Sequence, residues 1–264
     1  MKQSIFLLLL LLSLFSCEKD EFTGNDALIK KISITSVEKD KTYEISIFLP
    51  DNYTSSEEYY PTLYVLDAEQ DQEFVADQCR KTSKMFNIQN VIVVGIGYGD
   101  SRNMDYTPTA TSYGQGGSEA FMNFIKRELI PRIQQDFRAD PLRKNRVIIG
   151  HSFGGLMGAY AFTKHNEVFG NYLLLSSSLF YDNSVILQYE QQSRPANNQH
   201  QQLVFIGAGS TESSLLPGND LLYQRLVNFY PNTKSIFSLI PGKGHNTSKN
   251  TDIENAISFY FKNK

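Results

Sequence analysis

The feature that most constrains the fold is the segment RVIIGHSFGG at residues 146–155. It begins as a short apolar strand, continues as Gly-x-Ser-x-Gly, and is followed by small residues typical of a helix. A strand, a glycine-flanked serine and a helix in this order are typical of a nucleophile elbow. Gly150 and Gly154 leave room for the sharp turn, because a side chain at either position would collide across it. The segment predicts an exposed Ser152 hydroxyl at a helix N-terminus, where backbone N–H groups favour negative charge.

Short apolar segments alternate with helical segments along most of the chain. Strands are predicted at residues 62–66, 91–95, 147–150, 172–175, 203–206 and 235–240, and helices at 71–85, 117–137, 218–230 and 247–261. Ahead of them, residues 32–34 and 43–49 alternate apolar and polar side chains on either side of a polar turn, which indicates an antiparallel hairpin. Wholly apolar strands between helices predict a mostly parallel eight-stranded sheet with helices on both faces. One α/β domain is expected over residues 28–264.

An acid and a histidine follow the last two predicted strands. Ser152 comes after the fifth strand, Glu212 after the seventh, and His245 lies in a glycine-rich loop after the eighth. This chain order, at the C-terminal ends of strands, is that of the α/β-hydrolase fold. A free hydroxyl is a poor nucleophile, so Ser152 needs His245 as its base, and Glu212 would orient the imidazole. Asp220, near a helix N-terminus where it would also suit capping, is an alternative acid. A Ser–His dyad without an acid also stays open.

Loops at the same edge of the predicted sheet supply the remaining site candidates. The backbone N–H of Phe153 and a second N–H from Ala68 or Glu69, after the third strand, are expected to form an oxyanion hole. The connection between the sixth and seventh strands is short, so no large lid is expected. The candidate substrate-binding residues are Arg102, Tyr106, Phe180 and Tyr181.

Charge and residue spacing argue against several other functions. The net charge is −3 and no run of Lys and Arg occurs, so nucleic acid is not an expected partner. Nothing has the spacing of metal ligands, and Gly95-x-Gly97-x-Gly99 lacks the full dinucleotide-binding pattern. No metal and no cofactor are expected. The oligomeric state is not predicted.

The N-terminus reads as an export signal. Residues 5–15 form an apolar run that is too short to span a bilayer, and LFSC at residues 14–17 resembles a bacterial lipobox. We expect a signal peptide over residues 1–16, lipid on Cys17 and a tether over residues 17–27. The acidic residues after Cys17 indicate an outer-membrane anchor, at the periplasmic or the cell-surface face. A plain signal peptide with an unmodified Cys17 is the alternative.

Four segments resemble the putative-esterase family of α/β hydrolases. They are YPTLYVLD at residues 60–67, DSRNMDYTP at 100–108, GHSFGG at 150–155 and SSSLF at 176–180. The family includes enterobactin (siderophore) esterases, feruloyl and acetylxylan esterases and S-formylglutathione hydrolase, and the chain is most similar to the siderophore branch. The resemblance covers nearly all of residues 28–264 and implies Ser152 as nucleophile and His245 as base.

The resemblance and the residue pattern together lead to one expected activity. We expect a serine carboxylic-ester hydrolase that works through an acyl-enzyme. Its substrate would be a small-molecule or glycan ester, such as a siderophore ester or a feruloylated or acetylated polysaccharide. The alternatives are a non-catalytic ligand-binding lipoprotein on the same scaffold and an acyltransferase.

Overall fold

The structure is a computed structural model that describes residues 28–98 and 102–264. The expected signal peptide, the tether and the lipid site at Cys17 lie outside the described residues. Within the described ranges, every helix is too short or too polar to cross a lipid bilayer.

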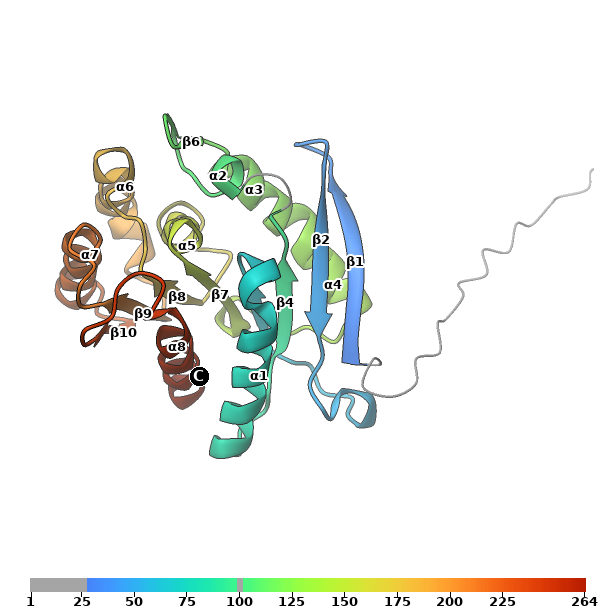
Figure 1. Cartoon of the computed structure of the whole chain (residues 1–264). Helices are drawn as coiled ribbons and strands as arrows, with labels where there is room; N and C mark the ends of the chain where they lie inside the picture. Colours follow the sequence, from blue (N-terminus) through green and yellow to red (C-terminus); the bar gives the residue numbers. More distant parts are fainter. Residues whose placement is uncertain (1–27, 99–101) are drawn as a thin grey trace, which may run out of the picture.

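One sheet of eight strands runs through the molecule in the order β1-β2-β4-β3-β7-β8-β9-β10 (Figure 1). The strands are β1 (Ile29–Ser36), β2 (Lys41–Phe48), β3 (Thr62–Val65), β4 (Ile92–Ile96), β7 (Arg146–His151), β8 (Asn171–Leu175), β9 (Gln202–Gly209) and β10 (Thr233–Ile240). Strand β2 pairs antiparallel with both β1 and β4. All the other neighbouring strands of this sheet pair parallel. The predicted mostly parallel sheet is confirmed. A two-stranded hairpin of β5 (Ala110–Thr111) and β6 (Gly114–Gln115) was not predicted.

Helices cover both faces of the sheet, as predicted. On one face α1 (Ala68–Phe86) packs beside α8 (Lys249–Asn263), and their apolar residues form one buried cluster with the strands. A second buried cluster lies on the other face. The helices that contribute to it are α3 (Ser118–Phe124), the π-helical turn η3 (Ile125–Leu129), α4 (Ile130–Asp136), α5 (Phe153–Lys164), α6 (Tyr181–Asn197) and α7 (Leu216–Phe229). The short elements are η2 (Tyr53–Ser55), α2 (Arg102–Asp105) and η4 (Arg143–Asn145).

Two helical regions differ from the expectation. The helical region expected over residues 117–137, in which Pro131 could kink the helix or start a second one, contains the π-helical turn η3 directly before Pro131 in the first turn of α4. Proline lacks the N–H that an uninterrupted helix would use, and the wider turn accommodates that loss. Helix α6, which fills the connection between β8 and β9, was not predicted.

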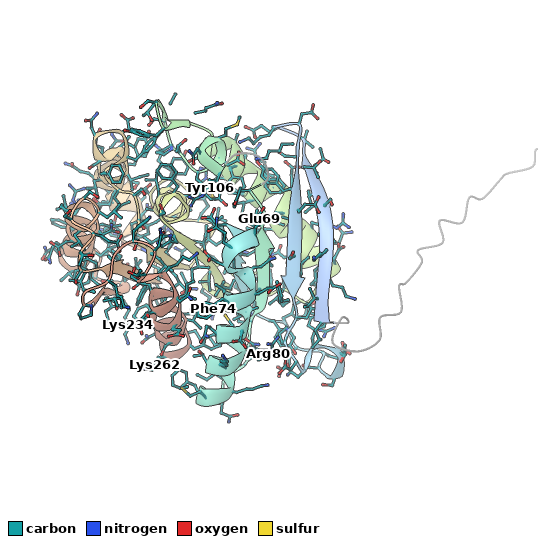
Figure 2. The ribbon with its side chains drawn as sticks, in the orientation of Figure 1. Glu69, Phe74, Arg80, Tyr106, Lys234 and Lys262 are labelled. Carbon is teal, nitrogen blue, oxygen red and sulfur yellow. The ribbon has the colours of Figure 1, made fainter. Side chains whose placement is uncertain are left out.

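Parallel strands bring their C-terminal ends to one edge of the sheet, where ligands bind in open α/β folds. The loops after β3, β7, β8, β9 and β10 therefore gather there. Figure 2 shows Glu69, in the first turn of α1, toward the same end of the molecule as Tyr106, whereas Arg80 of the same helix lies toward the other end.

Candidate active site

A strained turn between β7 and α5 presents Ser152. The serine has φ 61° and ψ −117°, a conformation that side chains rarely adopt and that is typical of a nucleophile elbow. A Cβ added at Gly150 would lie 2.4 Å from the carbonyl carbon of Gly154, and one at Gly155 would lie 2.4 Å from Ser177 Oγ. The backbone crossing at Gly150 leaves no room for a side chain, in agreement with the sequence argument.

Glu212 and His245 are joined by a hydrogen bond. His245 Nδ1 lies 2.9 Å from Glu212 Oε2, and a carboxylate only accepts, so the neutral imidazole carries its proton on Nδ1. Its Nε2 is then free to take a proton. The other carboxylate oxygen accepts from Ser176 Oγ at 2.8 Å and from the Gly209 amide at 2.5 Å. Burial opposes ionisation of Glu212, but these donors, His245 first, outweigh it and hold the pKa of Glu212 below its usual range.

Contacts between two loops bring the acid and the base together. A Cβ at Gly209, where β9 ends, would lie 2.3 Å from the carbonyl oxygen of Lys243 in the loop after β10. That oxygen accepts hydrogen bonds from the amide and the hydroxyl of Thr211, at 3.0 and 2.9 Å. The alternative acid, Asp220, is exposed on α7, where its carboxylate lies 3.5 Å from the side-chain amide of Gln224. The geometry favours Glu212.

Ser152 and His245 line the same pocket, of about 450 Å³. The other lining residues are Phe153, Ser178, Phe180, Thr211, Glu212, Ser213, Ser214, Leu215 and Gly244. Ser152 Oγ lies 3.5 Å from Ser178 Oγ, and within the described chain it makes no hydrogen bond to His245. Such catalytic hydrogen bonds are often long in the free enzyme and tighten when substrate binds.

Two supporting groups were missed from the sequence. One is the serine run after β8, in which Ser176 holds Glu212 and Ser178 lies beside Ser152. The other is His151, whose Nε2 lies 2.9 Å from the backbone carbonyl oxygen of His245. Since a carbonyl only accepts, Nε2 of His151 carries a proton. Burial, reinforced by the charge of His245, lowers the pKa of His151 to about 4, so the ring is neutral near physiological pH.

The expected oxyanion donors lie at two helix N-termini. The amides of Phe153 and Ala68 begin α5 and α1, and neither has a hydrogen-bond acceptor among the described residues. The two N-termini adjoin, because a Cβ at Gly154 would lie 3.0 Å from Asp67 Oδ2. Phe153 and Ala68 therefore stay predicted oxyanion donors. The backbone N–H of Glu69 stays the alternative to that of Ala68, and its side-chain carboxylate accepts from the Tyr98 amide at 3.0 Å.

Three of the four expected substrate-binding side chains are engaged within the protein. Tyr106 is fully buried and its hydroxyl accepts from the Asp67 amide at 3.1 Å. Tyr181 is 2% exposed and packs edge-on against Phe153. The expectation that these two rings bind substrate is therefore wrong, because both side chains are buried in the core. Phe180 is half-exposed and does line the pocket.

Arg102 forms a two-pronged ion pair with Asp67. Its Nε lies 2.8 Å from Asp67 Oδ1, and its Nη2 lies 2.6 Å from Oδ2 and 3.2 Å from the His151 carbonyl oxygen. Asp105, at the other end of the short helix α2, instead binds Lys39 and Lys41. Arg102 thus ties the loop after β3 to the elbow and is not free for a substrate anion.

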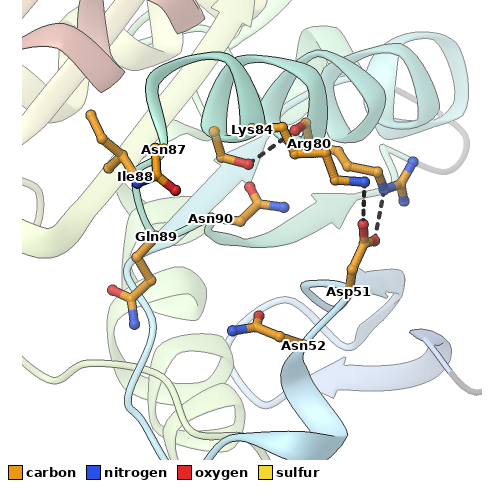
Figure 3. A pocket seen from close by; sticks show the side chains of 9 residues that line it. Asp51, Asn52, Arg80, Lys84, Asn87, Ile88, Gln89 and Asn90 are labelled. Carbon is orange, nitrogen blue, oxygen red and sulfur yellow. Dashed lines mark hydrogen bonds and ion pairs between the residues drawn. The ribbon is translucent and has the colours of Figure 1, made fainter.

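A second hollow, of about 350 Å³, lies at the far end of α1 (Figure 3). Its charges pair with each other, since Asp51 binds Arg80 at 3.0 Å and Lys84 at 2.7 Å. Within the part of the chain that the structure describes, its lining includes no cysteine and no histidine, and its one serine, Ser83, donates its hydroxyl to the carbonyl oxygen of Arg80 at 3.0 Å. Across residues 28–98 and 102–264, no group of three or more His, Cys, Asp or Glu side chains could hold a metal ion.

Comparison with known proteins identifies the family. The family model described as "Putative esterase" matches residues 36–239. The ferri-bacillibactin esterase BesA of Bacillus subtilis is 29% identical over 241 residues, which cover 80% of this chain and 82% of BesA. A siderophore triacetylfusarinine C esterase of Aspergillus fumigatus is 30% identical over 106 residues, 36% of each chain. The crystal structure of the BES protein of Bacillus cereus superposes with a TM-score of 0.81 at 25% identity, covering 92% of this chain and 98% of that one.

The matches extend over the strands and loops that carry Ser152 and Glu212, and the eight-stranded α/β sheet is shared with solved esterase structures. The chain belongs to the putative-esterase family, and it is a serine esterase.

Proposed function

We propose that the protein hydrolyses siderophore esters through a covalent acyl-enzyme. The observation that carries the mechanism is the 2.9 Å hydrogen bond between His245 and Glu212, at the rim of the pocket that Ser152 also lines. It argues against a non-catalytic binding protein, which would have no need of an oriented imidazole. The names of the relatives in Bacillus subtilis and Aspergillus fumigatus support the substrate class.

The chemistry follows from the three side chains. Ser152 Oγ forms a bond to the ester carbonyl carbon while His245 Nε2 takes its proton, and Glu212 stabilises the imidazolium. The carbonyl oxygen becomes an oxyanion, which faces the amides of Phe153 and Ala68. The bond to the alkoxy oxygen then breaks, and His245 returns the proton to the leaving alcohol. Water repeats the sequence on the acyl-enzyme and releases the carboxylic acid.

The pocket lining suits an uncharged aromatic ester. Phe153, Phe180 and Leu215 supply apolar surface, and Ser213 and Ser214 supply hydroxyls. The described lining holds no Lys or Arg, and Glu212 adds a negative charge. We therefore expect a catecholate trilactone to be a better substrate in its uncharged, iron-free form than as the trianionic ferric complex.

A side-by-side assay tests the substrate class. Purified protein and Ser152→Ala would be assayed with an iron-free catecholate trilactone, its ferric complex, a feruloyl ester and an acetylated xylan. We expect the highest kcat/KM with the iron-free trilactone and a loss in kcat of about 10⁶-fold in Ser152→Ala. Faster turnover of the feruloyl ester or the xylan would contradict the siderophore assignment. Unchanged turnover by Ser152→Ala would contradict the mechanism.

We also propose that the mature protein is exported and anchored to the outer membrane by lipid on Cys17. The lipobox-like LFSC and the short apolar run before it support this proposal. In a Gram-negative host, wild-type protein should incorporate labelled palmitate and sediment with membranes, and Cys17→Ser should do neither. Equal labelling of the two would rule out this anchor.

A further inference from the structure

A second carboxyl group lies behind the catalytic one. Asp252, in the first turn of α8, is fully buried, and neither of its carboxyl oxygens has a hydrogen-bond partner among the described residues. An ionised carboxylate is strongly disfavoured where it is buried without a cation and without a full hydrogen bond. The neutral acid is therefore the form that folding favours, and a neutral acid has a proton to donate.

Ser248 connects this group to the catalytic acid. It lies one helical turn before Asp252, is fully buried, and its hydroxyl is 3.4 Å from Glu212 Oε1. His245 binds the other oxygen of the same carboxylate. Space for Asp252 is made by Gly207 of β9, where an added Cβ would lie 2.6 Å from Asp252 Oδ1. Ser248 and Asp252 thus lie within one helical turn of each other, and Ser248 also approaches the carboxylate of Glu212.

The electrostatics agree with a neutral Asp252. Burial raises the pKa of Asp252 to about 7, the hydroxyl of Ser248 acts against the shift, and the negative charge of Glu212 adds to it. Two other charged groups near Asp252, on α1 and α8, pair with each other. Asp71 of α1 binds Lys249 at 2.5 Å, and His151 faces the carbonyl oxygen of His245.

We propose that Asp252 is a positioning residue that carries a proton in the active enzyme, with Asp252 O–H donating to Ser248 Oγ and Ser248 O–H donating to Glu212 Oε1. Loss of the Asp252 proton places a second negative charge behind Glu212. This charge favours the imidazolium form of His245, so less of the enzyme holds the free base at a given pH. The consequence for turnover rests on the proposed role of Glu212 and His245 in ester hydrolysis.

The first test is the pH profile of the full-length protein. Asp252→Asn is neutral at every pH and keeps a donor, and the exposed Asp220→Asn is its matched control. We expect the rising limb of kcat/KM in wild type and Asp220→Asn to contain two ionisations between about pH 5 and 8. Asp252→Asn should show a single ionisation, displaced to lower pH. A profile of Asp252→Asn that superimposes on wild type would overturn the proposal.

A second test does not need ester turnover. Wild-type protein and Asp252→Asn, each carrying ¹³C in its aspartate carboxyl groups, are compared with unlabelled protein by infrared spectroscopy, because burial also raises the pKa of Asp67, to about 6. We expect wild type to show, at about pH 6, an isotope-shifted carbonyl band of a protonated aspartic acid that Asp252→Asn lacks, and to lose it at about pH 8.5. No such band at pH 6 would overturn the proposal even if the esterase assays succeed.

Discussion

At the scale of single residues, the site depends on hydrogen bonds that reach the catalytic groups from neighbouring loops. Glu212 is held by Ser176, the Gly209 amide and His245, and the main chain of His245 is held by His151. These contacts fix the acid in its ionised form and leave Nε2 of His245 as the free nitrogen. The order of the relay was predictable from the sequence, because serine, acid and histidine follow successive strands. Its supports were not, because the family-like segments that contain Ser176 and His151 do not reveal which groups these side chains contact.

The role of Glu212 can be tested by an isosteric change. Glu212→Gln removes the carboxylate that orients His245 and stabilises its imidazolium, so we expect kcat to fall about 10⁴-fold. Asp220→Asn, on exposed α7, should keep the wild-type kcat. Both would be measured with a chromogenic ester at saturating concentration. Retained activity in Glu212→Gln, with loss in Asp220→Asn, would transfer the acid's role to Asp220.

Arg102 is expected to act on stability and not on substrate binding. Arg102→Gln leaves the carboxylate of Asp67, whose side chain is 4% exposed, without its cation. We expect the free energy of unfolding to fall by about 3–5 kcal/mol. Adding Asp67→Asn should restore part of this loss, since the uncompensated charge is then gone. Urea unfolding of the two variants measures both effects. A raised KM with unchanged stability would instead make Arg102 a substrate-binding residue.

At the scale of elements, a strand, a glycine-flanked turn and a helix hold Ser152 in a strained conformation. Gly150→Ala would place its Cβ 2.4 Å from backbone atoms of Gly154, which cannot move without displacing α5. We expect a loss of about 1–3 kcal/mol in the free energy of unfolding and a larger loss of activity than of stability. Gly218→Ala in α7, where the added atom meets only Leu179 at 3.0 Å, is the control. Thermal melts and ester assays of both variants check this, and a fully active Gly150→Ala would contradict it.

The sheet was predictable from the sequence, whereas α6 was not. Buried strands such as β4 and β8 are continuous apolar runs, and this pattern identifies them without tertiary information. In α6 a core-facing position is Glu190, fully buried between Arg194 and Arg225, and Pro195 lies inside the helix. An ion cluster in place of an apolar residue hides the helical period. Because the helix was not recognised in the sequence, its first residue, Tyr181, was assigned to a loop at the binding site.

At the scale of the whole molecule, Asp252 links the active site to the pH dependence of stability. Its folded pKa of about 7 lies above the usual value for an unfolded aspartate, about 3.9. The folded state therefore binds the proton more tightly, and the resulting stabilisation is present below about pH 3.9 and is lost as the pH rises to 7. The free energy of unfolding of Asp252→Asn, relative to that of wild type, should therefore rise by a few kcal/mol from about pH 4 to about pH 8. Guanidinium unfolding at the two pH values measures this. An equal difference at both would contradict a protonated Asp252.

Reaction of the intact protein with a fluorophosphonate tests the central claim, the relay of Ser152, His245 and Glu212, most directly. Mass spectrometry should find one adduct, on Ser152, and His245→Ala should react about 10²–10⁴-fold more slowly because the serine has lost its base. An adduct on another residue, or equal rates for wild type and His245→Ala, would contradict the account.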